Sequence, residues 1–199
     1  MITVVDLRAA AVRLRNAMEV EADALNEIDG ALGDGDLGVT MRRGARAVAE
    51  RAEEMPEDDI GKALMVAAQA FTKTSASSYG TLIATGLMAV AKEAKGRAGI
   101  ETADLSGLVA AARDKMMERG KAALGNKTVL DSLDAMAKAL NGATDPAKAA
   151  LDAAETAQIA LRDTPAQIGR ARIFAEKSVG MDDPGMVAMT KIVKAVTGR

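Results

Sequence analysis

Residues 29–38 read DGALGDGDLG, and this stretch decides between two very different folds. Its glycines match the G-x-G-x-x-G pattern of dinucleotide-binding folds, which requires a preceding strand and a βαβ unit. The residues before it, from Val4 to Leu25, instead repeat apolar side chains at helical spacing. The stretch is therefore predicted to join two helices, which favours an all-α fold.

The same stretch holds three carboxylates, those of Asp29, Asp34 and Asp36. Carboxylates this crowded repel one another unless a cation lies between them. Glycine permits positive φ, so the backbone can turn and direct all three at one small volume. Oxygen ligands suit Mg²⁺, which often shares its shell with phosphate, so we interpret the stretch as a metal site for a nucleotide. A solvated Asp-Gly turn is the simpler alternative, whereas an EF-hand is excluded because Ala45 stands where the loop needs glutamate.

The composition suits one helical domain spanning residues 1–199. Apolar residues make up 49% of the chain and aromatic residues 2%, as in tightly packed helices. The net charge of −2 forms no basic face, so we expect no nucleic-acid partner. We also expect no membrane contact and a cytoplasmic location, because the sequence has no bilayer-length apolar run, signal peptide or cysteine. Without histidine, the chain offers no imidazole base, zinc ligand or phosphohistidine.

Apolar periodicity and capping residues predict eight helices. Their approximate ranges are 4–28, 38–55, 60–74, 80–95, 104–119, 127–141, 145–161 and 185–197. Short connections imply antiparallel neighbours, so every second connection falls at the same end of the bundle. The four connections at that end, residues 29–38, 72–80, 120–128 and 169–185, are rich in glycine, hydroxyls or charge. We therefore expect an eight-helix antiparallel bundle with its site at that end.

Residues 120–128, GKAALGNKT, resemble a phosphate-binding loop but lie one residue out of phase with G-x-x-x-x-G-K-[ST]. The extra Asn126 and the missing strand argue against a true loop of that class. A helix-ending glycine followed by a capping turn explains the stretch as well as a nucleotide contact does.

Two further connections have features that suit anions. Residues 72–80 place hydroxyls and Lys73 before a helix N-terminus, which attracts anions, although serines there are usually only caps. Residues 169–185 contain Arg170 and Arg172, and arginine readily clamps phosphate, although such charges are most often solvated.

Taken together, these stretches resemble the L subunit of bacterial dihydroxyacetone kinase, DhaL, and the related domain of single-chain dihydroxyacetone kinases. The resemblance covers essentially the whole chain and keeps both order and spacing. It is carried by Ile28-Asp29, Gly33-Asp34-Gly35-Asp36, Met41-Arg42-Arg43-Gly44, Tyr79-Gly80-Thr81, Arg119-Gly120-Lys121-Ala122, Lys127-Thr128, Gly169-Arg170-Ala171 and Asp183-Pro184-Gly185.

The resemblance implies an α-barrel of eight antiparallel helices with ADP or ATP at one end. It implies two Mg²⁺ ions held by Asp29, Asp34 and Asp36, and no catalytic residue beyond this metal and nucleotide site. The residues that it places around the nucleotide are Leu37, Gly38, Val39, Thr40, Thr74, Ser75, Gly120, Val129, Arg170, Asp183, Pro184 and Gly185.

The implied function is that of the nucleotide-binding subunit of a two-component kinase for dihydroxyacetone or a related small ketose. The hydroxyketone is expected on a separate K subunit, because this chain has neither the histidine that captures it nor the length of that domain. The phosphoryl group comes from ATP, or from a phosphohistidine carrier that is fed by phosphoenolpyruvate and recharges a resident ADP. The sequence decides neither between these sources nor on an oligomeric state, although separation from the K domain leans toward the phosphoenolpyruvate-linked subunits.

The chain departs from the family's usual pattern at three places. Leu37 stands where histidine is usual, residues 72–78 lack the usual glycines, and Asn126 replaces a common aspartate. These departures leave open a second interpretation, a nucleotide-binding regulator that has lost transfer activity. A merely structural helical bundle is a third.

Overall fold

The computed structural model describes residues 1–74 and 77–199, and helices form nearly all of the regular structure in them. The eight α-helices of these residues are α1 (Val4–Leu32), α2 (Leu37–Glu50), α3 (Ile60–Thr74), α4 (Ser78–Glu93), α5 (Leu105–Gly120), α6 (Val129–Leu140), α7 (Pro146–Ala160) and α8 (Pro184–Thr197). Three 3-10 helices span Ala52–Glu54, Thr102–Asp104 and Arg170–Phe174. Strands β1 (Ile2–Thr3) and β2 (Gly99–Ile100) form one short antiparallel pair. The predicted all-α fold is confirmed.

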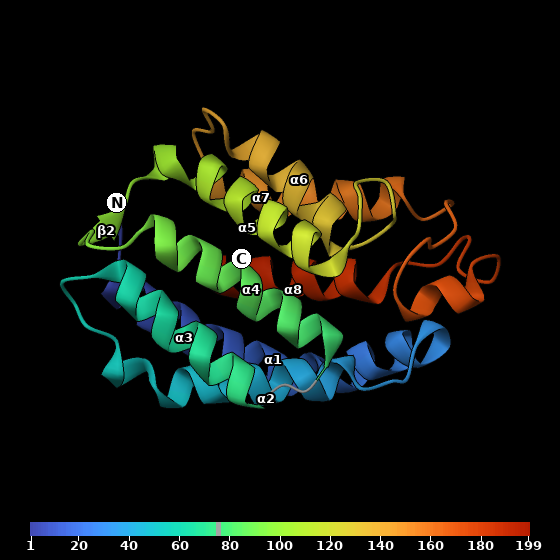
Figure 1. Cartoon of the computed structure of the whole chain (residues 1–199), viewed down its shortest axis with the longest axis horizontal. Coiled ribbons are helices and arrows are strands. Elements are labelled where there is room, and N and C mark those ends of the chain that lie inside the picture. The colour runs from blue at the N-terminus through green and yellow to red at the C-terminus, as the bar shows by residue number, and fades with distance from the viewer. Residues whose placement is uncertain (75–76) are drawn as a thin grey trace.

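The helices close into a barrel. Each one packs along the next in sequence, and α8 returns to pack against α1 (Figure 1). The α1–α2, α5–α6 and α7–α8 connections lie together at the right of Figure 1, and the N-terminus of α4 points the same way. The β1–β2 pair lies at the opposite end. Within the two described ranges, no helix is both long and apolar enough to cross a membrane.

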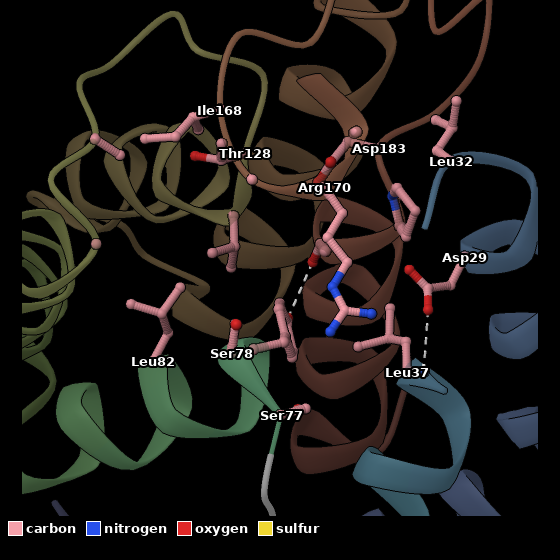
Figure 2. A pocket seen from close by; sticks show the side chains of 18 of the residues that line it. Asp29, Leu32, Leu37, Ser77, Ser78, Leu82, Thr128, Ile168, Arg170 and Asp183 are labelled. Carbon is pink, nitrogen blue, oxygen red and sulfur yellow. Dashed lines mark hydrogen bonds between the residues drawn. The ribbon is translucent and has the colours of Figure 1, made fainter. Parts of the chain in front are cut away.

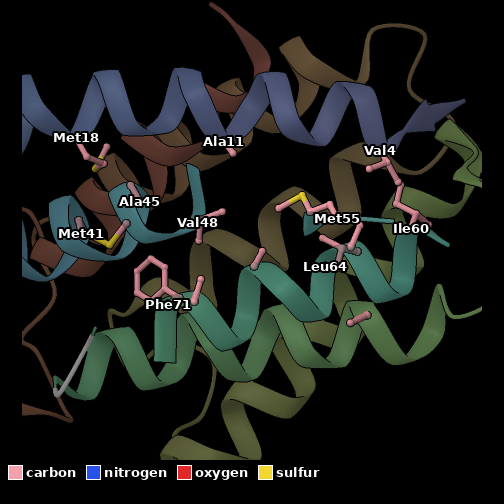
Figure 3. Close-up of a cluster of buried hydrophobic side chains, with 14 of the residues drawn as sticks. Val4, Ala11, Met18, Met41, Ala45, Val48, Met55, Ile60, Leu64 and Phe71 are labelled. Carbon is pink, nitrogen blue, oxygen red and sulfur yellow. The ribbon is translucent and has the colours of Figure 1, made fainter. Parts of the chain in front are cut away.

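Two clusters of apolar side chains fill the barrel. One joins α1, α2 and α3, where Met18, Met41 and Phe71 meet (Figure 3). The other lies among α5 to α8, around Met116 and Leu130. Methionine is flexible and fills irregular gaps between helices, which suits a chain almost without aromatic residues. Burying a side chain of this size contributes about 1.5–3 kcal/mol relative to leaving it exposed.

Helix starts follow the local capping pattern closely. Asp145 accepts a hydrogen bond from the Lys148 N–H (3.0 Å) at the start of α7. Thr3 and Asp6 form the expected capping box of α1. Helix α8 begins at Pro184, one residue before the predicted start, because Asp183 and proline repeat the same signal.

The helix ends differ more from the prediction than the helix starts do. Helix α1 continues through Leu32, so Asp29 belongs to its last turn and not to the loop. The chain leaves the helix only at Gly33, and it turns at Gly35, which has a φ of 74°. Helix α2 ends at Glu50, well before Met55, because a 3-10 turn follows. The two-residue strands were not predicted, since they are too short to show a periodicity.

Candidate functional site

The three aspartates of the α1–α2 connection come together. One carboxylate oxygen from each of Asp29, Asp34 and Asp36 lies within 4.8 Å of the others. Asp29 Oδ2 accepts hydrogen bonds from the backbone N–H groups of Asp36 (3.0 Å) and Leu37 (3.3 Å), which fixes its side chain. A Cβ at Gly33 would lie 2.6 Å from Asp29 Oδ1, so a larger residue there would displace this carboxylate. The turn therefore gathers the carboxylates as its sequence predicted.

This donor set fits a divalent cation. All three groups offer oxygen, the ligand type of Mg²⁺, and they are half-buried or exposed at the rim of the barrel. The Arg170 guanidinium forms an ion pair with Asp34, so a cationic group already lies against the cluster. Like charges held this close favour a neutralising cation, which agrees with a metal site.

The acidic turn opens into a cavity of about 750 Å³ at this end of the barrel. All four polar connections contribute to its wall, as predicted. Figure 2 shows Arg170 pointing into the cavity, with Asp29 and Leu37 on one side and Ser77 and Ser78 on the other. The predicted residues that line it are Asp29, Asp34, Asp36, Leu37, Gly120, Val129, Arg170, Asp183, Pro184 and Gly185.

The cavity has an apolar side that the sequence did not single out. Leu82, Met116, Ala122, Leu130 and Ile168 line it. Leu82, Met116 and Leu130 lie on helices with the spacing of a packed core, so their spacing indicated only that they face inward. Ala122 and Ile168 lie in connections between helices, where no periodicity marks them. Apolar walls with a few placed charges are the usual composition of a small-molecule site.

Three residues predicted at the nucleotide, Gly38, Val39 and Thr40, do not line the cavity. A Cβ at Gly38 would lie 1.8 Å from the carbonyl oxygen of Ala22, so this glycine lets α2 approach α1. The Val39 N–H donates to Asn26 Oδ1 of α1 (3.2 Å), and Thr40 is buried. Leu37 thus faces the cavity, whereas Gly38 and Val39 hold α2 against α1.

Thr74 also lies away from the cavity. Its hydroxyl donates to the carbonyl of Ala70 (3.2 Å), one turn earlier in α3, because threonine at a helix end readily bonds backward. It lines a smaller pocket with Arg43 and Arg46. Ser75, the other predicted contact of this connection, lies outside the described residues. The cavity is reached instead by Ser77, whose Oγ accepts from the Gly80 N–H (3.1 Å) and caps α4.

The start of α8 meets Tyr79 at the cavity wall. The Tyr79 hydroxyl donates to the Gly185 carbonyl (3.0 Å), and burial together with the nearby Asp183 charge raises the pKa of Tyr79 above its usual value. Asp183 Oδ1 accepts from the Met186 N–H (2.9 Å) and caps α8. Loss of hydration raises the pKa of the half-buried Asp183 to about 7, against the opposing effects of that hydrogen bond and of Lys127.

The raised pKa of Asp183 predicts a pH-dependent stability. Between about pH 4, where an unfolded aspartate ionises, and pH 7, the folded state binds one proton more than the unfolded chain. The free energy of unfolding contributed by Asp183 therefore falls as the pH rises through that window. Urea unfolding should show wild type losing stability relative to Asp183→Asn from pH 4 to 7, with no further change above it. Asparagine still caps helices, so a pH-independent difference would contradict the raised pKa.

Fold and site together define an all-helical barrel with a carboxylate cluster and a cavity at one end. The chain belongs to the DAK2 domain family, whose model matches residues 31–198. The expected resemblance to the DhaL subunits is confirmed. The ADP-binding subunit DhaL of a PTS-dependent dihydroxyacetone kinase from Lactococcus lactis is 32% identical over 161 residues, 81% of this chain and 79% of the relative.

Longer relatives match as well. An L-erythrulose kinase of Pectobacterium atrosepticum is 32% identical over 198 residues, 95% of this chain, but this chain spans only 34% of that enzyme. The crystal structure of the C. freundii dihydroxyacetone kinase in complex with AMP-PNP and Mg²⁺ superposes with a TM-score of 0.74 at 21% identity. That alignment covers 96% of this chain and 33% of the kinase, and it shows that the barrel fold is shared.

Proposed function

We propose that this chain is the nucleotide- and magnesium-binding component of a kinase that phosphorylates dihydroxyacetone or a related small ketose. The observation that carries the proposal is the cluster of three carboxylate oxygens, within 4.8 Å of one another, on the wall of a cavity of about 750 Å³. A cavity of this size can take a nucleotide, and the acidic cluster suits the metal ions that accompany its phosphates.

Two of the similar proteins support this proposal. The Lactococcus lactis relative, which this chain matches over most of both lengths, is an ADP-binding subunit of a dihydroxyacetone kinase. The C. freundii kinase, which shares the fold, was solved with AMP-PNP and Mg²⁺. The acidic cluster and the cavity are the features of this chain that suit the same ligands.

In the proposed complex, Asp29, Asp34 and Asp36 hold two Mg²⁺ ions. When bound, these ions neutralise the negative charge that develops on the transferred phosphoryl group. Arg170 is placed to contact the phosphates, because its guanidinium extends into the cavity beside the cluster. The N-terminus of α4, capped by Ser77, adds backbone dipoles that favour an anion.

The nucleobase and sugar are assigned to the rest of the cavity. Leu82, Met116 and Leu130 offer apolar surface for the base, and Gly120 and Val129 lie on the same wall. Asp183, Pro184 and Gly185, at the start of α8, complete the enclosure. The protein contributes to phosphoryl transfer mainly by positioning the reactants and neutralising charge, because the reaction requires little covalent catalysis.

The proposal includes partners. A K-type subunit or domain holds the hydroxyketone, which fits with this chain matching one third of the L-erythrulose kinase. The phosphoryl donor is ATP or a phosphohistidine carrier, and the second choice would place the protein in the cytoplasm with that carrier. Self-association into an oligomer is compatible with either.

Phosphoryl transfer tests the function directly. The protein is mixed with its cognate K subunit and dihydroxyacetone or erythrulose, and either ATP or the phosphocarrier with phosphoenolpyruvate is supplied. Formation of the sugar phosphate, absent when the K subunit is omitted, is the expected result. Tight Mg-ADP binding without transfer under any supply would favour the regulator, and failure to bind a nucleotide would contradict both.

A further inference from the structure

The Lys127 side chain lies inside the protein at the base of the connection between α7 and α8. Its Nζ donates to the carbonyl oxygens of Arg162 (2.8 Å), Thr164 (2.8 Å) and Ser178 (2.7 Å). An ammonium group has three N–H donors, so these bonds use all of them. Lys127 is only 1% exposed. Its ammonium group therefore binds backbone carbonyls and does not reach toward a phosphate, although the surrounding sequence resembles a phosphate-binding loop.

The three carbonyls belong to the two sides of one loop, residues 161–183, here called the α7–α8 loop. Arg162 and Thr164 lie where the loop leaves α7, and Ser178 lies where it returns. Two further bonds join the sides, from the Gly180 N–H to the Arg162 carbonyl (2.9 Å) and from the Ala166 N–H to Ser178 Oγ (2.8 Å). The Lys127 ammonium and these two bonds thus join the two sides of the loop at its base.

The part of the loop beyond this base faces the cavity. It contains the 3-10 helix Arg170–Phe174, and Gly169 and Arg170 line the wall. Arg170 also pairs with Asp34 across the mouth of the barrel. The loop whose base holds Lys127 is therefore the loop that carries Arg170 to the acidic turn.

Burial and the neighbouring charges act on the Lys127 ammonium in opposite directions. Burial lowers its pKa, while the carboxylates of Asp163, Asp182 and Asp183 oppose this effect and Arg162 adds to it. The backbone of Lys127 has a φ of +61°, which is unusual for a residue other than glycine and needs support from the structure around it. The three carbonyl bonds hold the end of its side chain in place.

We propose that Lys127 is a positioning residue, which closes the base of the α7–α8 loop and so holds Arg170 in place at the nucleotide cavity. This role rests on the proposed nucleotide site for its effect on binding. The closure of the loop does not depend on that site and can be measured in the free protein.

Hydrogen exchange and ADP titration of Lys127→Met test this role. Methionine keeps most of the side-chain length but removes the three donors. We expect residues 165–177 to exchange at least tenfold faster in the nucleotide-free variant, with α1 to α3 unchanged, and Mg-ADP to bind at least tenfold more weakly. In an Arg170→Gln background, Lys127→Met should weaken binding less than threefold, because both changes remove the same contact.

Lys121→Met is the matched control. Lys121 also has a positive φ, of 50°, and lies in the same connection, but it is exposed. Its replacement should leave both exchange and binding as in the wild type. Unchanged hydrogen exchange of residues 165–177 in Lys127→Met would overturn the proposal. A full tenfold loss of Mg-ADP affinity on adding Lys127→Met to Arg170→Gln would also overturn it, because the lysine would then act independently of the arginine.

Lys127→Gln replaces Lys127→Met if that variant does not fold. Glutamine keeps a polar head group, but its side chain is shorter and its amide has two N–H donors, so it cannot make all three carbonyl bonds. Faster exchange of residues 165–177 together with weaker Mg-ADP binding supports the loop-base role, and wild-type behaviour in both overturns it. If the wild type itself binds no Mg-ADP, the proposed function fails, whereas the exchange result still decides whether Lys127 closes the loop.

Discussion

Replacing Asp34 and Asp36 together by asparagine should weaken Mg²⁺-dependent binding of ADP by about a hundredfold or more. Asparagine keeps the size of each side chain but removes two of the three negative charges that lie within 4.8 Å of one another. A hydrogen bond or contact to a charged group contributes about 1.5–3 kcal/mol, so losing two weakens binding by about a hundredfold or more. Calorimetric titration with ADP in the presence of Mg²⁺ measures the loss.

The same variant should not unfold. Removing charge from a crowded cluster relieves repulsion, and the exposed Asp34–Arg170 pair contributes little to stability. The thermal midpoint without ligand should therefore equal or exceed that of the wild type, and only the wild type should be stabilised by Mg-ADP. Asp23→Asn, which changes an exposed aspartate of α1 away from the cavity, is the control and should bind normally. Wild-type affinity in the double variant would remove the acidic turn from the nucleotide site.

Replacing Gly38 by alanine should strongly destabilise the barrel. The added Cβ would lie 1.8 Å from the Ala22 carbonyl oxygen, which belongs to the backbone of α1 and cannot rotate away. Helices α1 and α2 would have to separate, and we expect a loss of roughly 3 kcal/mol or more in the free energy of unfolding. Urea unfolding followed by circular dichroism measures this loss.

Gly107→Ala provides the matched control for this substitution. Gly107 lies in α5, and a Cβ there would meet no atom within 4 Å. Alanine favours helix over glycine, so this variant should be more stable by about 0.5–1 kcal/mol. A loss of similar size at both positions would show that the close approach of α2 to α1 is not what requires glycine at position 38.

Local patterns in the sequence predicted much of the fold. Asp145-Pro146 places a capping carboxylate before a proline, and the helix predicted there begins at Pro146. Asp183-Pro184 repeats this signal and begins α8 one residue before the predicted start. The acidic turn was also predictable, because three carboxylates interleaved with glycines in one short stretch favour a turn that brings them together. Short connections between antiparallel helices then placed four loops at one end, and these loops do meet at the cavity.

Residues whose role depends on a distant partner could not be assigned from the sequence. Gly38 lies in a glycine-rich loop motif, but its role is set by Ala22 of another helix. Lys127 lies in a stretch that resembles a phosphate-binding loop. Only the fold shows that its ammonium contacts carbonyls some 35 to 51 residues away. Leu82 and Met116 have the spacing of core residues, so nothing local distinguishes a cavity wall from a packed interior.

Titration of the wild-type protein with ADP, with Mg²⁺ and then with EDTA in its place, tests the central claim most directly. If the three carboxylates bind the nucleotide through magnesium, ADP should bind at least about tenfold more tightly with the metal, because tenfold corresponds to about 1.4 kcal/mol and a single hydrogen bond to a charged group contributes about 1.5–3 kcal/mol. Equal affinity with and without Mg²⁺ would contradict the assignment of the acidic turn as the metal site.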